Sequence, residues 1–135
     1  MSKANVLVVD DQDSIRHFVG KALEADGYTV VTAGSVREAR EAIEREMPDL
    51  AFLDLKLPDG TGIELLREIK RVQSEVPVVL MTAFGELETA VEAMSAGAFW
   101  FVKKPFQNEE LLALAQRALE SQKLWLELRR LRHQA

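Results

Sequence analysis

The stretch that decides the fold runs from Pro48 to Gly62 and reads PDLAFLDLKLPDGTG. Its apolar residues 50–53 lead directly into a carboxylate, Asp54, and the chain then reaches a turn sequence at residues 58–60. An ionised carboxylate beside a buried run costs free energy unless cations or hydrogen-bond donors surround it. The compensating groups are therefore expected where the other apolar runs of the chain end.

Short apolar runs alternate with helical patterns along the whole chain. These runs are rich in β-branched residues and have no polar face, as is typical of parallel strands that are covered on both sides. Strands are expected at residues 6–9, 28–31, 50–53, 76–81 and 99–102. The sequence thus predicts an α/β fold, a (βα)5 doubly wound parallel five-stranded sheet with helices on both faces.

The helices between these strands have recognisable ends. Asp13 or Ser14 is expected to cap the first helix, and Gly27 is expected to end it. Ser35 and Thr61 each precede a glutamate by three residues, which is the capping-box pattern.

Apolar spacings of three and four residues predict which helical side chains face the sheet. On the first helix the expected inward residues include Ile15, Phe18 and Val19. On the helix expected at residues 86–96 they include Val91.

Composition excludes several classes of protein. The 135 residues suffice for one domain with a substantial core. The net charge is −5 and no long basic run is present, which argues against nucleic acid binding by this chain. Without cysteine there are no disulfides or thiolate metal sites. No apolar stretch approaches the roughly 20 residues of a membrane span, and no signal-peptide pattern is present, so a cytoplasmic location is expected.

The last helix is longer than a sheet-covering helix needs to be. It is expected to run from Asn108 to about His133. Its second half carries a stripe of Leu124, Leu128 and Leu131. Such a stripe beyond the domain needs a partner, and a short coiled coil in a homodimer is the natural one. The alternative is a frayed amphipathic tail, because two heptads are marginal in water.

Polar groups stand at the carboxyl ends of four expected strands. They are Asp10-Asp11, Asp54, Thr82 and Lys103-Lys104. In an open parallel α/β sheet these ends share one edge, where ligands bind. We therefore expect three carboxylates, a hydroxyl and an ammonium to meet in one crevice.

This set of groups predicts a particular chemistry. Three close carboxylates repel one another unless a proton or a cation joins them. An all-oxygen site suits Mg²⁺, and a site with a dication, a lysine and a hydroxyl attracts a phosphoryl group. Asp54, alone at the end of a central strand, is the expected nucleophile, while Asp10 and Asp11 are better placed to hold the metal.

The motifs that carry these residues resemble those of the response-regulator receiver domain of bacterial two-component signalling. The motifs are VLVVDD at residues 6–11, Leu53-Asp54, Met81-Thr82-Ala83 and Lys104-Pro105-Phe106. The resemblance implies a strand order of 2-1-3-4-5. It also implies a receiver domain at residues 1–120, followed by a helical linker at 121–135 that is a possible coiled coil.

The resemblance implies a role for each matching residue. Asp54 corresponds to the acceptor of a phosphoryl group from a histidine kinase. Asp11, Asp54 and the main-chain carbonyl of Lys56 correspond to the Mg²⁺ ligands, and Asp10 helps to position the metal and its water. Lys104 corresponds to the lysine that pairs with the phosphoryl group.

Two further residues correspond to the switch of the family. Thr82 matches the hydroxyl that moves to the phosphoryl oxygen, and Phe101 matches the aromatic that then swings inward. These movements are expected to change the face formed by the fourth helix, fifth strand and fifth helix, and so to control dimerisation and an output domain that lies outside this chain. Lys56, beside the site, and Trp100, on this face, are positions that vary within the family.

A sub-family is indicated as well. The motifs at residues 83–86 and 96–98 and the leucine-rich extension resemble receivers of bacterial enhancer-binding activators, which depend on an alternative sigma factor. Neither a Walker loop nor a helix-turn-helix pattern occurs in the chain.

Two other functions are compatible with some of these residues. An aspartyl-nucleophile phosphatase is suggested by Asp59-Gly-Thr61, but Leu57 stands where the first aspartate of that motif belongs. A receiver-like module that no longer uses phosphate is the other alternative, and the complete acidic site argues against it. Taken singly, a threonine such as Thr82 is more often a strand-end hydroxyl bonded to the backbone, and a lysine such as Lys104 is more often solvated.

Overall fold

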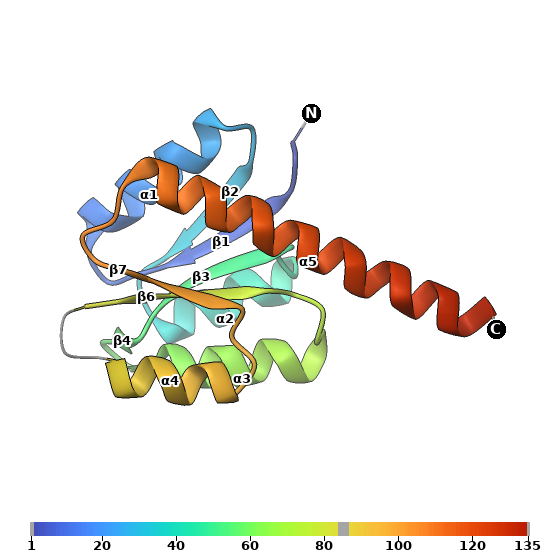
Figure 1. Ribbon diagram of the computed structural model, residues 1–135. Coiled ribbons are helices and arrows are strands. Elements are labelled where there is room, and N and C mark those ends of the chain that lie inside the picture. The colour runs from blue at the N-terminus through green and yellow to red at the C-terminus, as the bar shows by residue number, and fades with distance from the viewer. Residues whose placement is uncertain (1, 84–86, 135) are drawn as a thin grey trace.

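The computed structural model describes residues 2–83 and 87–134. Its centre is a five-stranded parallel sheet with the order β2-β1-β3-β6-β7 (Figure 1). The strands are β1 (Asn5–Val9), β2 (Thr29–Ala33), β3 (Leu50–Asp54), β6 (Val78–Thr82) and β7 (Trp100–Lys103). The expected order 2-1-3-4-5 is confirmed, with β6 and β7 as the fourth and fifth strands of the sheet.

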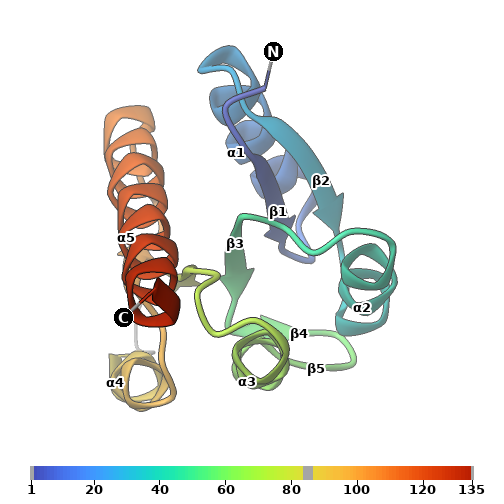
Figure 2. The same ribbon diagram turned by 90° about the vertical axis from the view of Figure 1, so that its right-hand side faces the viewer.

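Helices cover both faces of this sheet. They are α1 (Asp13–Ala25), α2 (Val36–Arg45), α3 (Gly62–Val72), α4 (Leu87–Ser95) and α5 (Asn108–Gln134). Figure 2 shows α1 and α5 on one face and α2, α3 and α4 on the other. The predicted α/β architecture is therefore confirmed.

The core consists of two apolar layers, one on each face of the sheet. Successive strand residues point to opposite faces, so Val6 and Val8 pack towards α1 and α5, while Leu7 and Val9 pack towards α2 and α3. β3 is buried along its whole length, and Phe52 is fully enclosed. This burial on both faces explains why the strands carry continuous apolar runs.

Several expected boundaries are shifted. β2, β6 and β7 each end one or two residues later than the apolar runs, because backbone pairing continues into the polar strand ends, as in the Thr82–Lys103 pair. Helix α1 is capped by Gln12, without a side-chain bond, rather than by Asp13 or Ser14. The start expected for the fourth helix at Glu86 lies outside the described residues.

Two expected core residues are exposed. Phe18 is 43% exposed, and its ring lies beside that of Phe106, with the ring centres 6.1 Å apart. Val91 on α4 is 59% exposed. Helical spacing alone puts both with the inward residues, but each is one position from a buried residue, Val19 or Ala90, which is about 100° round the helix.

The capping predictions for α2 and α3 are confirmed. The Ser35 hydroxyl accepts from the Glu38 N–H at 3.1 Å, and the Thr61 hydroxyl accepts from the Glu64 N–H at 3.2 Å. Gly27 follows α1 with a φ of 97°, a left-handed conformation that favours glycine.

A small hairpin was not anticipated. Strands β4 (Lys56–Leu57) and β5 (Gly60–Thr61) pair antiparallel directly after β3. At its tip Asp59 accepts from the N–H groups of Val36 and Arg37, at 2.8 and 3.0 Å. These bonds, made at the amino end of α2, hold the pKa of Asp59 below its usual value.

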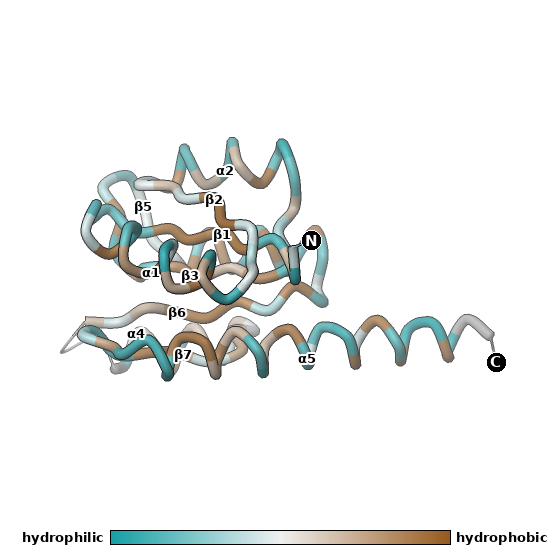
Figure 3. The backbone as a smooth tube through the Cα atoms, turned by 90° about the horizontal axis from the view of Figure 1, so that it is seen from above, coloured by the Kyte–Doolittle hydropathy of each residue, from teal (hydrophilic) through white to brown (hydrophobic). Residues whose placement is uncertain are grey.

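Helix α5 continues well past the sheet (Figures 1 and 3). The expected extent of this helix is confirmed, and in Figure 3 apolar and polar bands alternate along the projecting part. Leu124, Leu128 and Leu131 are 66%, 53% and 50% exposed there. One contact returns to the domain, where Arg129 Nη1 lies 3.0 Å from an oxygen of Glu75, a residue with only 8% exposure.

No helix in the described part of the chain is long and apolar enough to cross a membrane.

Candidate functional site

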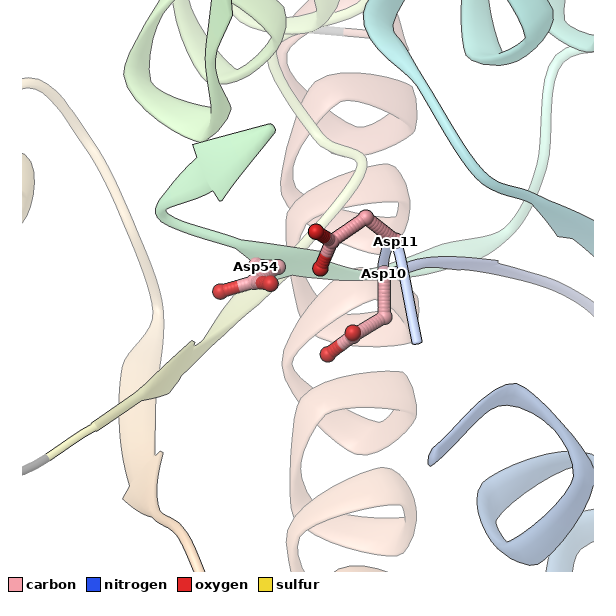
Figure 4. Close-up of side chains that lie close together, drawn as sticks. All are labelled: Asp10, Asp11 and Asp54. Atoms are coloured by element: carbon pink, nitrogen blue, oxygen red, sulfur yellow. The ribbon is translucent and has the colours of Figure 1, made fainter. Parts of the chain in front are cut away.

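The acidic residues predicted to converge do lie together at the carboxyl edge of the sheet. Asp10 and Asp11 follow β1, and Asp54 ends the adjacent strand β3. One carboxylate oxygen from each of the three lies within 4.8 Å of the others. Figure 4 shows the three side chains gathered at this edge. The parallel pairing of β1 with β3 produces this cluster, because it aligns the two strand ends.

Asp10 is fully buried and held on several sides. Its N–H donates to the Ala33 carbonyl at 3.0 Å, and its Oδ1 accepts from the Gln12 N–H at 2.9 Å. Its Oδ2 makes no well-directed hydrogen bond with the described residues, but Lys104 Nζ lies only 2.7 Å away. Oδ2 is therefore ion-paired with Lys104.

Lys104 joins two of the carboxylates. Its Nζ lies 2.7 Å from Asp10 and 3.4 Å from Asp54, and its side chain is 17% exposed. Burial by itself would lower the pKa of Lys104, but its close ion pair with Asp10 and the charges of both aspartates raise it above its usual value. Lys104 is therefore charged, which contradicts the alternative interpretation of a solvated lysine; the neighbouring Lys103 is exposed.

Asp54 has a strongly altered acidity. Burial first, and the negative charge of Asp10 second, raise its pKa from 3.8 to about 6. Lys104 and a hydrogen bond from the Lys56 N–H oppose this rise. Asp54 is buried, with 6% exposure, and with this pKa its carboxylate is nevertheless mostly ionised at neutral pH.

Thr82 stands at the end of β6 and is buried. Its hydroxyl donates to the Val102 carbonyl at 3.5 Å, which is the long limit of a hydrogen bond. This is the backbone bond expected if Thr82 is an ordinary strand-end hydroxyl. Because the bond is weak, little free energy holds the hydroxyl in this orientation.

Phe101 lies on β7, the strand that pairs with β6, and stands opposite Leu80, two residues before Thr82. It is partly buried against the core layer that includes residues of α3 and α4. The Trp100 ring stacks on it, with centroids 5.5 Å apart and a 23° angle between the planes. Trp100 itself is 50% exposed, as expected for a residue at a contact surface.

Lys56 begins the hairpin that follows Asp54 and is exposed. Its N–H bonds to the Asp54 carboxylate, which fixes the peptide just beyond the acidic residue. The role of its carbonyl as a metal ligand stays a prediction.

Two residues near the site were missed by the sequence reasoning. A Cβ on Gly62 would lie 2.2 Å from the Asp54 carbonyl oxygen, so only glycine allows this close approach. Arg16 of α1 donates from Nη1 to the Asp10 carbonyl at 2.6 Å. The glycine after a capping threonine was a usable signal for Gly62, whereas nothing in the spacing of α1 distinguishes Arg16 from a surface arginine.

The donor set fits a hard divalent cation. The carboxylates of Asp10, Asp11 and Asp54 carry three charges, and the nearby Lys104 supplies one positive charge. Oxygen donors of this kind, with Asp11 open to solvent, suit Mg²⁺ that keeps several waters. The predicted ligands are Asp11, Asp54 and the Lys56 carbonyl, with Asp10 behind them.

Residues 6–116 match the family described as the response regulator receiver domain. The matched segment contains all the strand-end residues discussed above, from Asp10 to Lys104. The chain belongs to this receiver family. The resemblance that the motifs indicated is thereby confirmed.

Individual relatives show how much of a larger protein the receiver represents. The regulatory protein AtoC of Escherichia coli (strain K12) is 40% identical over 130 residues, 96% of this chain and 28% of that protein. The nitrogen assimilation regulatory protein NtrX of Azorhizobium caulinodans is 41% identical over 130 residues, 95% of this chain and 29% of that protein. The receiver thus spans under a third of these curated relatives.

Solved structures agree with this comparison. NtrX from Brucella abortus in complex with ADP superposes with a TM-score of 0.92 and 41% identity, over 97% of this chain and 30% of that one. A response regulator receiver domain protein from Clostridium thermocellum superposes with a TM-score of 0.85 and 33% identity, over 90% of this chain and 98% of that one. These relatives agree with the sub-family that the sequence indicated, although residues 84–86 of its motif lie outside the described residues.

Proposed function

We propose that this receiver is a phosphorylation-activated signalling switch in which Asp54 accepts a phosphoryl group from a histidine kinase. The observation that supports this most directly is the setting of Asp54, beside Asp10 and Asp11 and 3.4 Å from the Lys104 ammonium. Its reaction is limited to self-phosphorylation and self-dephosphorylation, so the receiver is not an enzyme that turns over a separate substrate.

The phosphoryl transfer depends on an ionised Asp54. A carboxylate oxygen forms a bond to phosphorus while the bond from phosphorus to the kinase imidazole nitrogen breaks. With a pKa of about 6, most Asp54 carboxylates are ionised at pH 7 and are ready to attack. Lys104 is already held at this carboxylate, so it can pair with an incoming phosphoryl oxygen without a large rearrangement.

Mg²⁺ is the cofactor that this donor set would hold. When bound, it neutralises negative charge on the phosphoryl oxygens and on the carboxylates. Asp11, Asp54 and the Lys56 carbonyl are the proposed ligands, and buried Asp10 keeps them in position through its own fixed backbone.

The switch is proposed to begin at Thr82. Its weak bond to the Val102 carbonyl is exchanged for a stronger one to a charged phosphoryl oxygen. Phe101 then moves inward and changes the face of α4, β7 and α5. Exposed Val91 and Trp100 on α4 and β7 support a contact role for this face.

The proposed partners follow from these surfaces. The receiver forms a homodimer through the α5 extension and the α4–β7 face, and it controls an output domain of an enhancer-binding transcription activator. A short coiled coil formed by residues 121–135 would bury the exposed leucines of the extension. The proposed location is cytoplasmic, where the kinase presents its phosphohistidine.

Mass spectrometry of the intact protein tests the acceptor. After incubation with acetyl phosphate and Mg²⁺, the wild type is expected to gain one phosphoryl group and Asp54→Asn none. Asp26→Asn is a matched control, because this partly exposed carboxylate pairs with Lys3 at the other end of α1. Retention of the adduct in Asp54→Asn would disprove the assignment.

The same samples separate the two alternatives. Steady release of phosphate from sugar or nucleotide phosphates would favour the aspartyl-nucleophile phosphatase. Failure to form an adduct, together with no binding of Mg²⁺, would favour the phosphate-independent module.

A further inference from the structure

Arg16 lies where three parts of the chain meet. It belongs to α1, and its Nη1 donates to the main-chain carbonyl of Asp10 at 2.6 Å. Its other terminal nitrogen pairs with Asp13 in the first turn of the same helix. The side chain is only 22% exposed, so this arginine is not a freely solvated surface residue.

The loop after β2 supplies a close-fitting wall for the guanidinium. A Cβ on Gly34 would lie 3.0 Å from Arg16 Nη1 and 3.5 Å from its Cζ. The bare backbone of Gly34 therefore leaves the space that the guanidinium fills. Gly34 is fixed in turn by its N–H, which donates to Glu38 at 2.9 Å.

The carbonyl that Arg16 holds belongs to the turn that carries the metal-facing acids. Asp10 is anchored through its N–H, its carbonyl and its carboxylate. Among the described residues, by contrast, no hydrogen bond or ion pair of the Asp11 carboxylate is found, and this residue is exposed. The position of the Asp11 side chain therefore depends on the backbone of the turn.

We propose that Arg16 is a positioning residue for divalent cation binding. By holding the Asp10 carbonyl, it orients the turn so that Asp11 faces Asp54. This role rests on the metal site proposed above. It is carried by the fit of the guanidinium between α1, the turn after β1 and the loop after β2.

Charge and positioning predict opposite effects when Arg16 is removed. A positive group near three carboxylates repels a dication, so loss of the charge alone would tighten Mg²⁺ binding. Loss of a group that orients a metal ligand weakens metal binding by about tenfold or more. Arg16 holds the carbonyl of the peptide that precedes the proposed ligand Asp11. The sign of the change in affinity therefore decides between the two.

Isothermal titration of the metal-free receiver with MgCl₂ tests the proposal. For Arg16→Ala we expect the Kd to rise about tenfold. Arg16→Lys keeps the charge but loses the planar fork, so its Kd is expected to rise as well. Arg37→Ala is the matched control, because Arg37 is an exposed arginine of α2 that pairs with Glu41, and its Kd should equal that of the wild type.

Gly34→Ala provides a second test that leaves every charge in place. Its methyl group would crowd the Arg16 guanidinium and the Glu38 carboxylate, which must shift slightly to make room. Positioning therefore predicts a weaker Kd, and a pure charge effect predicts no change. Thermal unfolding in metal-free buffer confirms that each variant is folded before titration. This variant also keeps the proposal testable if Arg16→Ala fails to fold.

The outcomes are distinct. A tighter or unchanged Kd in Arg16→Ala, or unchanged values in both Arg16→Lys and Gly34→Ala, would overturn the role of Arg16 and leave the metal site intact. If the wild type itself shows no Mg²⁺ binding, the metal site fails, and the role of Arg16 fails with it.

Discussion

The crevice at the carboxyl edge of the sheet and the extension of α5 differ in whether their side chains find partners within the same chain. In the crevice, buried Asp10 has a cation and several donors around it. On the extension, leucines about half exposed or more have no comparable cover. The buried polar groups of the crevice thus find partners within the chain, whereas an uncovered apolar stripe is typical of a surface that meets another chain.

The largest effect is expected where the crevice loses its cation. Lys104→Met leaves Asp10 buried beside Asp54 without an ammonium, and we expect the free energy of unfolding to fall by about 3 kcal/mol in EDTA. Lys103→Met is the control, because this neighbouring lysine is exposed. Urea unfolding measures both, and equal stabilities would show that the ion pairs contribute nothing.

The backbone beside Asp54 is the next most sensitive point. Gly62→Ala places a Cβ 2.2 Å from the Asp54 carbonyl oxygen, and the overlap is expected to cost about 2–3 kcal/mol of unfolding free energy. In Gly20→Ala on α1 the nearest atom lies 3.8 Å away, so this control should gain up to about 1 kcal/mol from helix propensity. Equal values for the two variants would contradict the close approach.

The pH dependence of the unfolding free energy tests the raised pKa of Asp54. Its pKa is about 6 in the folded chain and near 3.8 when unfolded, so the folded chain binds the proton more tightly. Its contribution to stability is therefore highest below pH 4, declines as pH rises to about 6, and then stays constant.

Asp54→Asn removes this decline. In metal-free buffer at pH 7 we expect the variant to be more stable than the wild type by about 2 kcal/mol, with the difference shrinking as pH falls towards 4. Thermal unfolding across this range measures it. A difference that is independent of pH would contradict the raised pKa.

The extension is expected to respond less. Arg129→Met leaves the nearly buried Glu75 without its guanidinium, and because Arg129 is half exposed we expect a loss of about 1 kcal/mol. Arg130→Met removes only an exposed pair with Glu127, so it should change the unfolding free energy by less than about 0.5 kcal/mol. A clear loss in Arg130→Met would show that the extension is held differently.

The smallest effect on folding is expected from Leu128→Glu. This residue is 53% exposed, so the unfolding free energy of the monomer should change by less than about 0.5 kcal/mol. Self-association in sedimentation velocity should nevertheless fall, as it should when residues after Gln122 are deleted. Unchanged sedimentation in both would disprove pairing through the extension.

Much of the site was predictable because strand ends in a parallel sheet share one edge. Asp10, Asp11, Asp54 and Lys104 could be assembled from order along the chain alone. Phe18 and Val91 could not be placed, since spacing defines the centre of a helical stripe but not its margins. Arg16 and the Asp59 bond to α2 join segments whose approach depends on loop conformation, which leaves no periodic signal.

The sequence by itself determined the fold class, the set of polar groups that meet in the crevice and the length of the last helix. These follow from periodicity and from the residue at each strand end, which are local properties of the chain. Only the tertiary structure decided that Lys104 pairs with both Asp10 and Asp54, that Arg16 holds the Asp10 carbonyl, and that Gly62 must lack a Cβ. Each of these depends on distances of 2–4 Å between segments far apart in sequence, and packing of the whole domain sets such distances.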